Sequence, residues 1–410
     1  MNPVLLLAAL NILSVAACST LKLSPEPQTS TSAEIYPFTN TPELDKPGIH
    51  LGGFSGLSFE GQDEKGRLVF MTHTDRGPNR DILILNGTRR VRPFVIPEFQ
   101  PQWVRFMLNE KGEAEILSRI PLMGLRNKPL TGLPNYLGDR GDEYPVDDLD
   151  KALPLDPMGL DLEGIARDRD GSFWMGEEYR PSILHFDARG HLQSRWIPMG
   201  NSLTFGTPVL PERYMRRVQN RGFEGIADDG SFIYAFLQGT IPGDQGIVRI
   251  LKVNRRGGAP VGEYLYRFDV TPKEWPTVDK IGDAVAIGPG RFLVIEQNSA
   301  TDQRAFRRIF EVDLKTATDI LKTQGRGPIT EDTLCPSGQT SRICVEPAQK
   351  RMVVDLAEIG MRSLEKAEGL AVVDASTLAV INDNDFGVGE NKAAKSNLVL
   401  IRLAQPVNVR

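Results

Sequence analysis

One motif recurs five times along this 410-residue chain, and such a repeat constrains the fold more strongly than any other feature of the sequence. Each unit starts with an acidic residue or serine followed by a small residue. A short apolar strand, a tight turn and a second apolar strand ending in polar residues then follow. The units start at Ser55, Glu163, Glu224, Asp283 and Glu368. Two short strands joined by a Gly-containing turn are typical of a β-hairpin.

Further apolar strands follow the hairpin in several units, at 183–186, 248–253 and 308–312. A hairpin with one or two outer strands is typical of a propeller blade, and radial repetition of blades closes the fold. The intervals between unit starts are 61 (163 to 224), 59 (224 to 283) and 85 (283 to 368) residues. The first interval, 108 residues (55 to 163), has room for two blades or for one blade with a large insertion.

We therefore predict an all-β fold, a six-bladed β-propeller with five visible repeat units and one degenerate blade. A β-sandwich is the rival fold, but it does not account for one motif recurring at these intervals. The Gly-, Pro- and Asp-rich stretch 124–157 and the segment around Cys335 and Cys344 are expected to be loop insertions that shape a pocket.

The first 17 residues carry no charged side chain, and their apolar stretch, 4–13, is too short to span a bilayer but suits a signal peptide. The sequence at 15–18, Val-Ala-Ala-Cys, resembles the bacterial lipobox. This resemblance implies that residues 1–17 are removed and that Cys18 is lipidated, which would anchor the protein in the cell envelope, on the periplasmic or outer-membrane face. An ordinary signal peptide with an incidental Cys18 is the alternative.

Residues 18–41 are rich in Ser, Thr and Pro and are expected to form a flexible tether, so the propeller is assigned to 42–410. Beyond the first residues, no stretch approaches 18 uncharged apolar residues, so the lipid is the only membrane contact we expect. Net charge is −5 (48 basic against 53 acidic residues), which argues against a nucleic-acid partner. We also expect the protein to be a monomer.

The cysteines at 335 and 344 lie nine residues apart, and export favours a disulfide between them over two free thiols. With four histidines and neither a CxxC pair nor an HExxH motif, a zinc site is not expected. The sequence Asp168–Gly171 resembles half of a calcium-binding loop, but we predict that it is a hairpin turn.

In a propeller the first strand of each blade lines the central channel, so residues that start the repeat units fall on one ring. Glu163, Glu224, Asp283 and Glu368 would form this ring, which is broken at Ser55. Converging carboxylates repel one another unless a cation or raised pKa values relieve them. Oxygen-rich sites select calcium or magnesium. The alternative is that each Glu simply accepts hydrogen bonds from backbone amides of its own blade.

A second set of acidic residues stands where the second strand of each unit ends. It comprises Asp75, Glu177, Glu178, Glu296, Asp383 and Asp385. In 382–387, alternating acidic and amide side chains precede a glycine, which would let the loop curl around a cation, so Asp383 and Asp385 join the four ring carboxylates as predicted calcium ligands, with magnesium as the alternative cation.

Arg76, Arg180 and Arg221 each lie near an acidic motif and could bind a phosphate or pair with an acidic neighbour. The chain has no Gly-x-Ser-x-Gly elbow, so a serine-esterase triad is disfavoured. Ser55 with His73, on the paired strand, is a weak nucleophile candidate.

The repeated Glu-Gly-Ile/Leu-Ala unit, Thr-Asp-Arg-Gly-Pro-Asn at 74–79 and Asn-Asp-Asn-Asp-Phe-Gly at 382–387 resemble the phytase-like esterase domain family over about 48–403. The resemblance implies a propeller and a phosphoester hydrolase activity that depends on acidic residues. We expect a small phosphoester as substrate and Glu177, Glu178 or Asp75 as the catalytic carboxylate. A non-catalytic, calcium-stabilised propeller that binds a glycan or protein, and a calcium-dependent lactonase or sugar-ester hydrolase, are the alternatives.

Overall fold

The computed structural model describes residues 30–409 except 86, 136–141, 323–327, 336–343, 365 and 389–394. The predicted signal peptide, Cys18 and the tether up to residue 29 therefore lie outside the described residues. The described residues form β-strands and four short 3-10 helices. These helices are η1 (Leu125–Asn127), η2 (Glu212–Arg216), η3 (Glu331–Thr333) and η4 (Asp385–Gly387). No helix in this part of the chain has the length and apolar character needed to cross a membrane.

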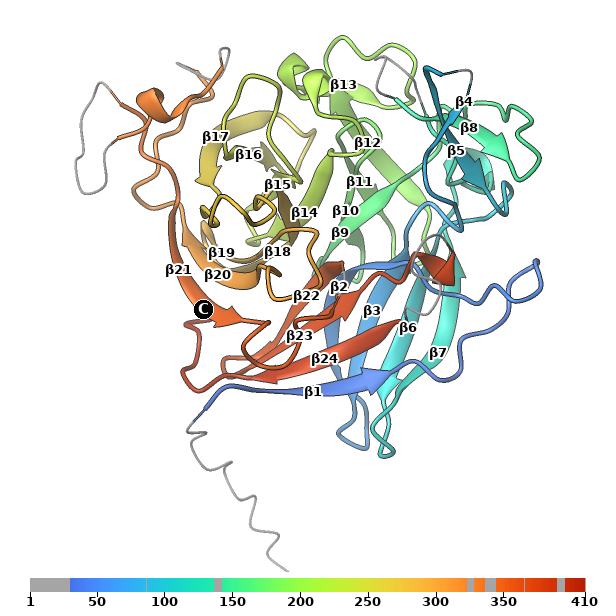
Figure 1. Cartoon of the computed structure of the whole chain (residues 1–410), viewed down its shortest axis with the longest axis horizontal. Coiled ribbons are helices and arrows are strands. Elements are labelled where there is room, and N and C mark those ends of the chain that lie inside the picture. Colours follow the sequence, from blue (N-terminus) through green and yellow to red (C-terminus); the bar gives the residue numbers. More distant parts are fainter. Residues whose placement is uncertain are drawn as a thin grey trace, which may run out of the picture.

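Five sheets of four or five strands surround a common centre, and each sheet is one blade (Figure 1). Blade 1 contains β2 (Phe54–Gln62), β3 (Leu68–Thr74), β6 (Gln102–Leu108) and β7 (Ala114–Pro121). Blade 2 contains β9 (Leu162–Arg167), β10 (Phe173–Glu177), β11 (Ser182–Phe186), β12 (Leu192–Pro198) and β13 (Thr207–Leu210). Blade 3 contains β14 (Phe223–Asp228), β15 (Phe232–Leu237), β16 (Ile247–Asn254) and β17 (Pro260–Arg267).

Blade 4 contains β18 (Lys280–Gly288), β19 (Arg291–Gln297), β20 (Arg307–Asp313) and β21 (Gln349–Asp355). Blade 5 contains β22 (Ala367–Asp374), β23 (Thr377–Asn382), β24 (Asn397–Arg402) and β1 (Ser32–Pro37). The five innermost strands, β2, β9, β14, β18 and β22, each contact the next around a closed circle. The predicted all-β propeller is therefore confirmed.

The prediction of a sixth blade is wrong for the described residues, because the closed circle has five members. A sixth, three-stranded sheet does exist, but it is built from two insertions in the long first interval. It contains β4 (Leu83–Leu85), β5 (Arg89–Phe94) and β8 (Tyr144–Asp147), at the upper right of Figure 1. None of its three strands belongs to the closed circle of innermost strands, and its β5 and β8 run parallel. The first interval thus holds one blade with insertions.

The predicted tether ends earlier than expected, because β1 pairs antiparallel with β24 and supplies the outer strand of blade 5. This corrects the assignment of 18–41 to a tether, since Ser32–Pro37 belongs to the propeller. Phe38 then leaves the strand and packs on Phe54 and Phe106 of blade 1, at ring-centroid distances of 4.9 and 4.8 Å. The N-terminal strand therefore joins the last blade to the first.

Every innermost strand has a β-bulge at the repeated motif, where two residues face one on the second strand. The small residue of the motif is needed because the neighbouring blade approaches closely here. A Cβ on Gly164 would lie 2.5 Å from the carbonyl oxygen of Glu224, and one on Gly225 would lie 2.8 Å from Ala284. The Gly of the motif therefore reflects packing between blades, and the residue before it is brought to the channel.

Two smaller predictions are confirmed. The segment at 168–171 is a hairpin turn between β9 and β10, in which the Gly171 amide donates to the Asp168 carbonyl at 3.1 Å and Gly171 has φ +85°. Cys335 and Cys344 form a disulfide in the insertion between β20 and β21.

The contact made by Phe38 gives a test of closure by the N-terminal strand. We expect Phe38→Ala to lower the free energy of unfolding by about 3–5 kcal/mol, because the ring is buried between two aromatic neighbours. Ile35→Ala is the matched control in the same segment, since Ile35 is 49% exposed, and it should cost less than about 1 kcal/mol. Urea unfolding followed by circular dichroism measures both. Equal effects of the two substitutions would contradict closure through Phe38.

Candidate functional site

A pocket of about 390 Å³ lies where the motifs of several blades meet. Its lining is almost entirely polar and contains carboxylates together with basic side chains. The carboxylates are Asp75, Glu143, Asp161, Glu163, Glu178, Glu368 and Asp383. The basic residues are Arg76, Arg90, Arg92, Arg221, Lys280 and Lys366.

Three of the four predicted ring carboxylates come together here. Glu163 and Glu368 line the pocket, and Glu224 is buried beside it, accepting a 2.8 Å hydrogen bond from the pocket residue Gln238. Ser55, at the broken position, donates to Glu368 over 3.5 Å. The nearby His73 is buried, which lowers its pKa to about 4, and its Nδ1 lies 3.2 Å from the Thr74 carbonyl oxygen. Ser55 and His73 thus have separate partners, which disfavours that dyad.

Asp283 does not share the position predicted for it. In blade 4 the glycine of the motif, Gly282, precedes the acidic residue instead of following it, and Gly282 makes the close approach to blade 5. The two carboxylate oxygens of Asp283 accept from the amides of Ala284 at 2.7 Å and Leu370 at 2.8 Å. The expected ring of four carboxylates in register is therefore corrected to three, and Asp283 ties blade 4 to blade 5.

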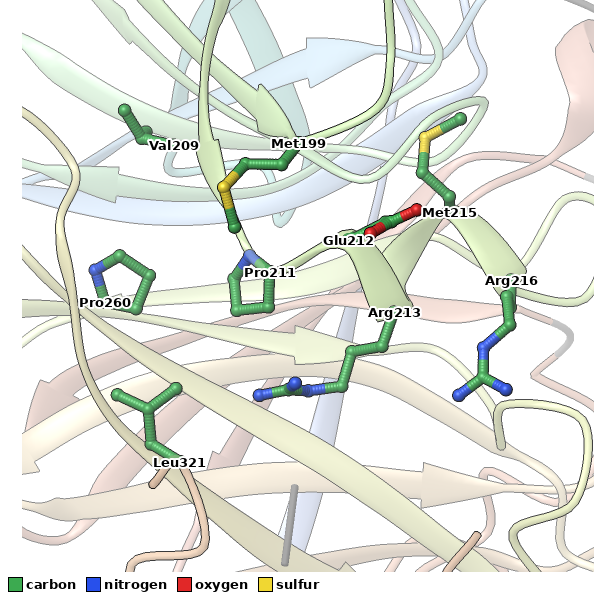
Figure 2. Close-up of a pocket in the computed structure, with 9 residues that line it drawn as sticks. All are labelled: Met199, Val209, Pro211, Glu212, Arg213, Met215, Arg216, Pro260 and Leu321. Carbon is green, nitrogen blue, oxygen red and sulfur yellow. The ribbon is translucent and has the colours of Figure 1, made fainter. Parts of the chain in front are cut away.

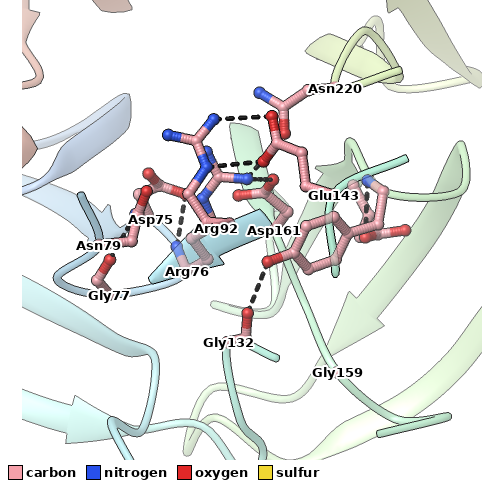
Figure 3. Close-up of polar contacts among 12 residues, drawn as sticks. Asp75, Arg76, Gly77, Asn79, Arg92, Gly132, Glu143, Gly159, Asp161 and Asn220 are labelled. Atoms are coloured by element: carbon pink, nitrogen blue, oxygen red, sulfur yellow. Dashed lines mark hydrogen bonds and ion pairs between the residues drawn. The ribbon is translucent and has the colours of Figure 1, made fainter. Parts of the chain in front are cut away.

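The loop after β3 brings Asp75 and Arg76 into the pocket (Figure 3). Arg76 donates from Nη1 to Asp161 at 3.0 Å and to Asn220 at 2.7 Å. A carboxylate oxygen of Asp75 lies within 4.8 Å of oxygens of both Asp161 and Glu163. Asp161, just before β9, is a pocket residue that the repeat did not reveal. Its signal was its place two residues before Glu163, where the motif starts.

The loop after β23 supplies a second group. Asp383 accepts from Lys366 Nζ at 2.8 Å, and Asp385 also pairs with Lys366. One oxygen each from Asp75, Asp383 and Asp385 lie within 4.8 Å of one another. Asp75 therefore belongs to two overlapping groups of three carboxylates, one toward blade 2 and one toward blade 5.

The neighbours Glu177 and Glu178 have different surroundings. Glu177 is fully buried and accepts hydrogen bonds from the Tyr179 and Arg180 amides, and from the side chains of Asn135, Ser182 and Arg195. Its carboxylate is thus occupied within blade 2 and does not line the pocket. Glu178 lines the pocket, and its Oε1 is buried without a hydrogen-bond partner among the described residues. Of the predicted catalytic carboxylates, the structure brings Asp75 and Glu178 together and separates Glu177 from them.

Of the three predicted phosphate-binding arginines, two line the pocket and one does not. Arg76 and Arg221 line the pocket, where Arg221 is held by Asp279 at 2.8 Å. Arg180 is buried away from it, bonded to Asp142, which also accepts from Arg217 at 3.1 Å. Arg180 is therefore a member of a structural ion-pair network.

Burial and mutual repulsion raise the pKa values of most carboxylates at the pocket. Burial is the largest cause in each case, and it raises the pKa of Asp161 to about 6, of Asp383 to about 7, and of Glu178 and Glu368 to about 8. The pKa values of Asp75, Glu163 and Glu224 are raised well above the ordinary range, with neighbouring carboxylates as the next cause. Glu143 and Asp385 go the other way, because burial is outweighed by Arg92 and Lys366, which lower their pKa values.

A larger cavity, about 690 Å³, lies elsewhere, against η2 (Figure 2). Its lining is mostly apolar, from residues such as Met199, Pro211 and Leu321. Among its charged residues, Arg213 is already paired with Glu263 at 2.8 Å. Among the described residues, this cavity brings no group of carboxylates together. The clustered carboxylates and basic side chains lie in the smaller pocket.

The raised pKa values give a prediction about stability without metal. A carboxyl whose pKa is raised on folding stabilises the folded state fully below its unfolded pKa of about 4, and this contribution is lost as pH rises through the folded pKa. For Glu178 this loss falls between about pH 4 and pH 8. In chelator-treated buffer, Glu178→Gln should therefore gain in melting temperature relative to wild type as pH rises from about 5 to about 8.5.

Glu177→Gln is the matched control. Because it removes the charge partner of the buried Arg195, it should destabilise the protein by about 3–5 kcal/mol across the same pH range. Differential scanning calorimetry at several pH values measures both variants. A pH-independent difference between Glu178→Gln and wild type would show that Glu178 does not hold a raised pKa.

Comparison with known proteins adds the family. An uncharacterized secreted protein of Arthroderma benhamiae is 27% identical over 201 residues, and the match spans 40% of this chain and 39% of that protein. Among solved structures, an exo-β-1,3-galactanase from Phanerochaete chrysosporium aligns with a TM-score of 0.40 at 7% identity, over 90% of this chain and 64% of that chain. The PQQ-bound aldose sugar dehydrogenase of Streptomyces coelicolor gives 0.34 at 11% identity, over 92% and 99%.

The motifs that build the pocket fall within the match to a family model. This model is phytase-like, with the description "esterase-like activity of phytase", and it matches residues 49–386, which run from before blade 1 to the loop after β23. The chain belongs to the phytase-like family.

Proposed function

We propose that this chain is a divalent-cation-dependent phosphoesterase that hydrolyses phosphate esters of small molecules in the central pocket. One observation carries the proposal: two groups of three carboxylates share Asp75 in a pocket that is also lined by arginine and lysine. Carboxylates suit a hard cation, and guanidinium and ammonium groups suit phosphate oxygens. Family membership supports the same class of reaction.

The cluster of carboxylates is chemically suited to bind a cation. Seven have raised pKa values because burial and mutual repulsion disfavour their ionised forms, and a bound cation would relieve both. All the donors are oxygens, which favours calcium, with magnesium as the alternative. Asp75 would hold the cation with Asp161 and Glu163, or with Asp383 and Asp385. When bound, the cation would offset phosphoryl charge and acidify water.

The chain's own residues would do the rest. Arg76 and Arg221 line the pocket, and each has a protein partner that holds its side chain in place. We expect their guanidinium groups to bind phosphoryl oxygens. Glu178 is proposed as the general base that takes a proton from the attacking water. Its Oε1 is buried and has no hydrogen-bond partner among the described residues, and its pKa of about 8 lies near the working range of such a base.

Calcium addition to stripped protein tests the proposal. Calcium should raise the melting temperature and restore hydrolysis on a panel of a phosphomonoester, a phosphodiester and a lactone, with turnover on the phosphoesters. Glu163→Gln should lower kcat/KM by about 100-fold or more and weaken calcium binding measured by calorimetry. Asp283→Asn is the control at the shifted motif position, and its calcium affinity should stay near that of wild type.

Each class of result decides between the functions. Turnover on the lactone alone would replace phosphoester hydrolysis by sugar-ester or lactone hydrolysis. A calcium-dependent rise in melting temperature without turnover on any substrate would favour a non-catalytic, calcium-stabilised propeller. No turnover on any substrate and no calcium-dependent change in melting temperature would contradict both the proposed cation site and the proposed hydrolysis.

We also propose that the protein is exported and lipid-anchored, on the basis of the Val-Ala-Ala-Cys sequence at 15–18. The secreted Arthroderma protein supports export over part of the chain. Expressed in a bacterium, wild type should take up radiolabelled palmitate and fractionate with membranes. Cys18→Ser should lose the label and leave the membrane fraction. Labelling of the Cys18→Ser variant, or an unlabelled wild type, would contradict lipidation at Cys18.

A further inference from the structure

Six basic side chains line the central pocket, and four of them have a carboxylate partner. These pairs are Arg76–Asp161 (3.0 Å), Arg92–Glu143 (2.6 Å), Arg221–Asp279 (2.8 Å) and Lys366–Asp383 (2.8 Å). The side chains of the other two, Arg90 and Lys280, make no ion pair or hydrogen bond with the residues that the structure describes. A cation lining a confined, polar pocket without a partner is a candidate for binding an anion.

Arg90 comes from β5 of the small inserted sheet, outside the blades. Alternation along a strand puts Arg90 and Arg92 on one face and Arg89 on the other, and both Arg90 and Arg92 line the pocket. Arg92 is held by two hydrogen bonds to Glu143, at 2.6 and 2.8 Å. The Nε of Arg90 is buried and lacks a partner among the described residues, so a donor at the pocket wall is left unsatisfied.

Lys280 comes from the start of β18 in blade 4, where the ring has glycine in place of glutamate. It is partly buried and close enough to Glu224 and Glu368 to oppose the rise that burial causes in their pKa values. Lys280 thus brings a positive charge to the wall where a fourth ring carboxylate was expected. Arg90 and Lys280 therefore bring positive charges to the pocket from two different elements, the inserted sheet and blade 4.

We propose that Arg90 and Lys280 bind anionic oxygen atoms of the substrate and so determine which esters the pocket accepts. This inference rests on the proposed phosphoesterase function. The paired Arg76 and Arg221 would hold the reacting phosphoryl group beside the carboxylates. Arg90 and Lys280 would select for negative charge on the substrate, because an uncharged ligand would leave them unpartnered. Arg90 further offers a planar fork that suits phosphate or carboxylate oxygens.

Inorganic phosphate is the probe, titrated calorimetrically into calcium-supplemented protein from which only the signal peptide is missing. Arg90→Gln and Lys280→Gln should each weaken phosphate binding by about tenfold or more, and Arg90→Gln should leave the melting temperature unchanged. Arg90→Lys should retain part of the affinity, since it keeps the charge. The control is Arg89→Gln on the opposite face of β5, whose exposed guanidinium lies 4.3 Å from the Tyr144 ring centroid. It should bind phosphate as wild type does.

In the hydrolysis assay, Arg90→Gln should raise KM for a phosphomonoester while kcat stays within about threefold of wild type, since Arg90 would bind ground state and transition state alike. Wild-type phosphate affinity in both Arg90→Gln and Lys280→Gln would overturn the inference, as would equal losses in Arg89→Gln. If the protein binds phosphate through these residues but hydrolyses no phosphoester, the proposed function fails and the anion site stands. Phosphoester hydrolysis with unchanged KM in both variants would instead support the proposed function and overturn the anion site.

Discussion

The innermost strands of neighbouring blades approach one another closely, and this packing determines both the motif and the position of the pocket. At the bulges of β9, β14 and β22, the next blade comes so near that a Cβ would not fit, and Gly164, Gly225 and Gly369 satisfy this requirement. The same bulge brings the preceding residue to the channel. Packing between blades therefore determines where Glu163, Glu224 and Glu368 converge, and the local pKa values follow from that convergence.

Without a bound ligand, the charged groups of the pocket destabilise the folded protein. Buried carboxylates at short range disfavour their own ionisation, and only four of the six basic groups at the pocket have a carboxylate partner among the described residues. A divalent cation at Asp75 and an anionic ester against Arg90 and Lys280 would satisfy both parts together. Loops from blades 1 and 5 and the inserted sheet bring these charges to the ring, so the repeat supplies the scaffold and the irregular segments supply many of the charged side chains.

The sequence was a good guide wherever the repeat was regular. It predicted the propeller, the convergence of Glu163, Glu224 and Glu368, and the hairpin at 168–171, because each depends on a motif of regular spacing. It failed where one residue decides the direction of a side chain. Gly282 precedes Asp283, so the carboxylate turns to the Ala284 and Leu370 amides, and Glu177 and Glu178 point to different surroundings although they are adjacent. Partners that lie far apart in the chain, such as β1 with β24, carry no local signal.

Anomalous diffraction from crystals grown with calcium would show whether the carboxylates around Asp75 bind a divalent cation. We expect a peak in the pocket with carboxylate oxygens of Asp75 and its partners at about 2.3–2.6 Å. The peak should vanish in crystals of Asp75→Asn. A pocket without anomalous density at saturating calcium, in a protein that is folded and active, would show that these carboxylates do not form a cation site.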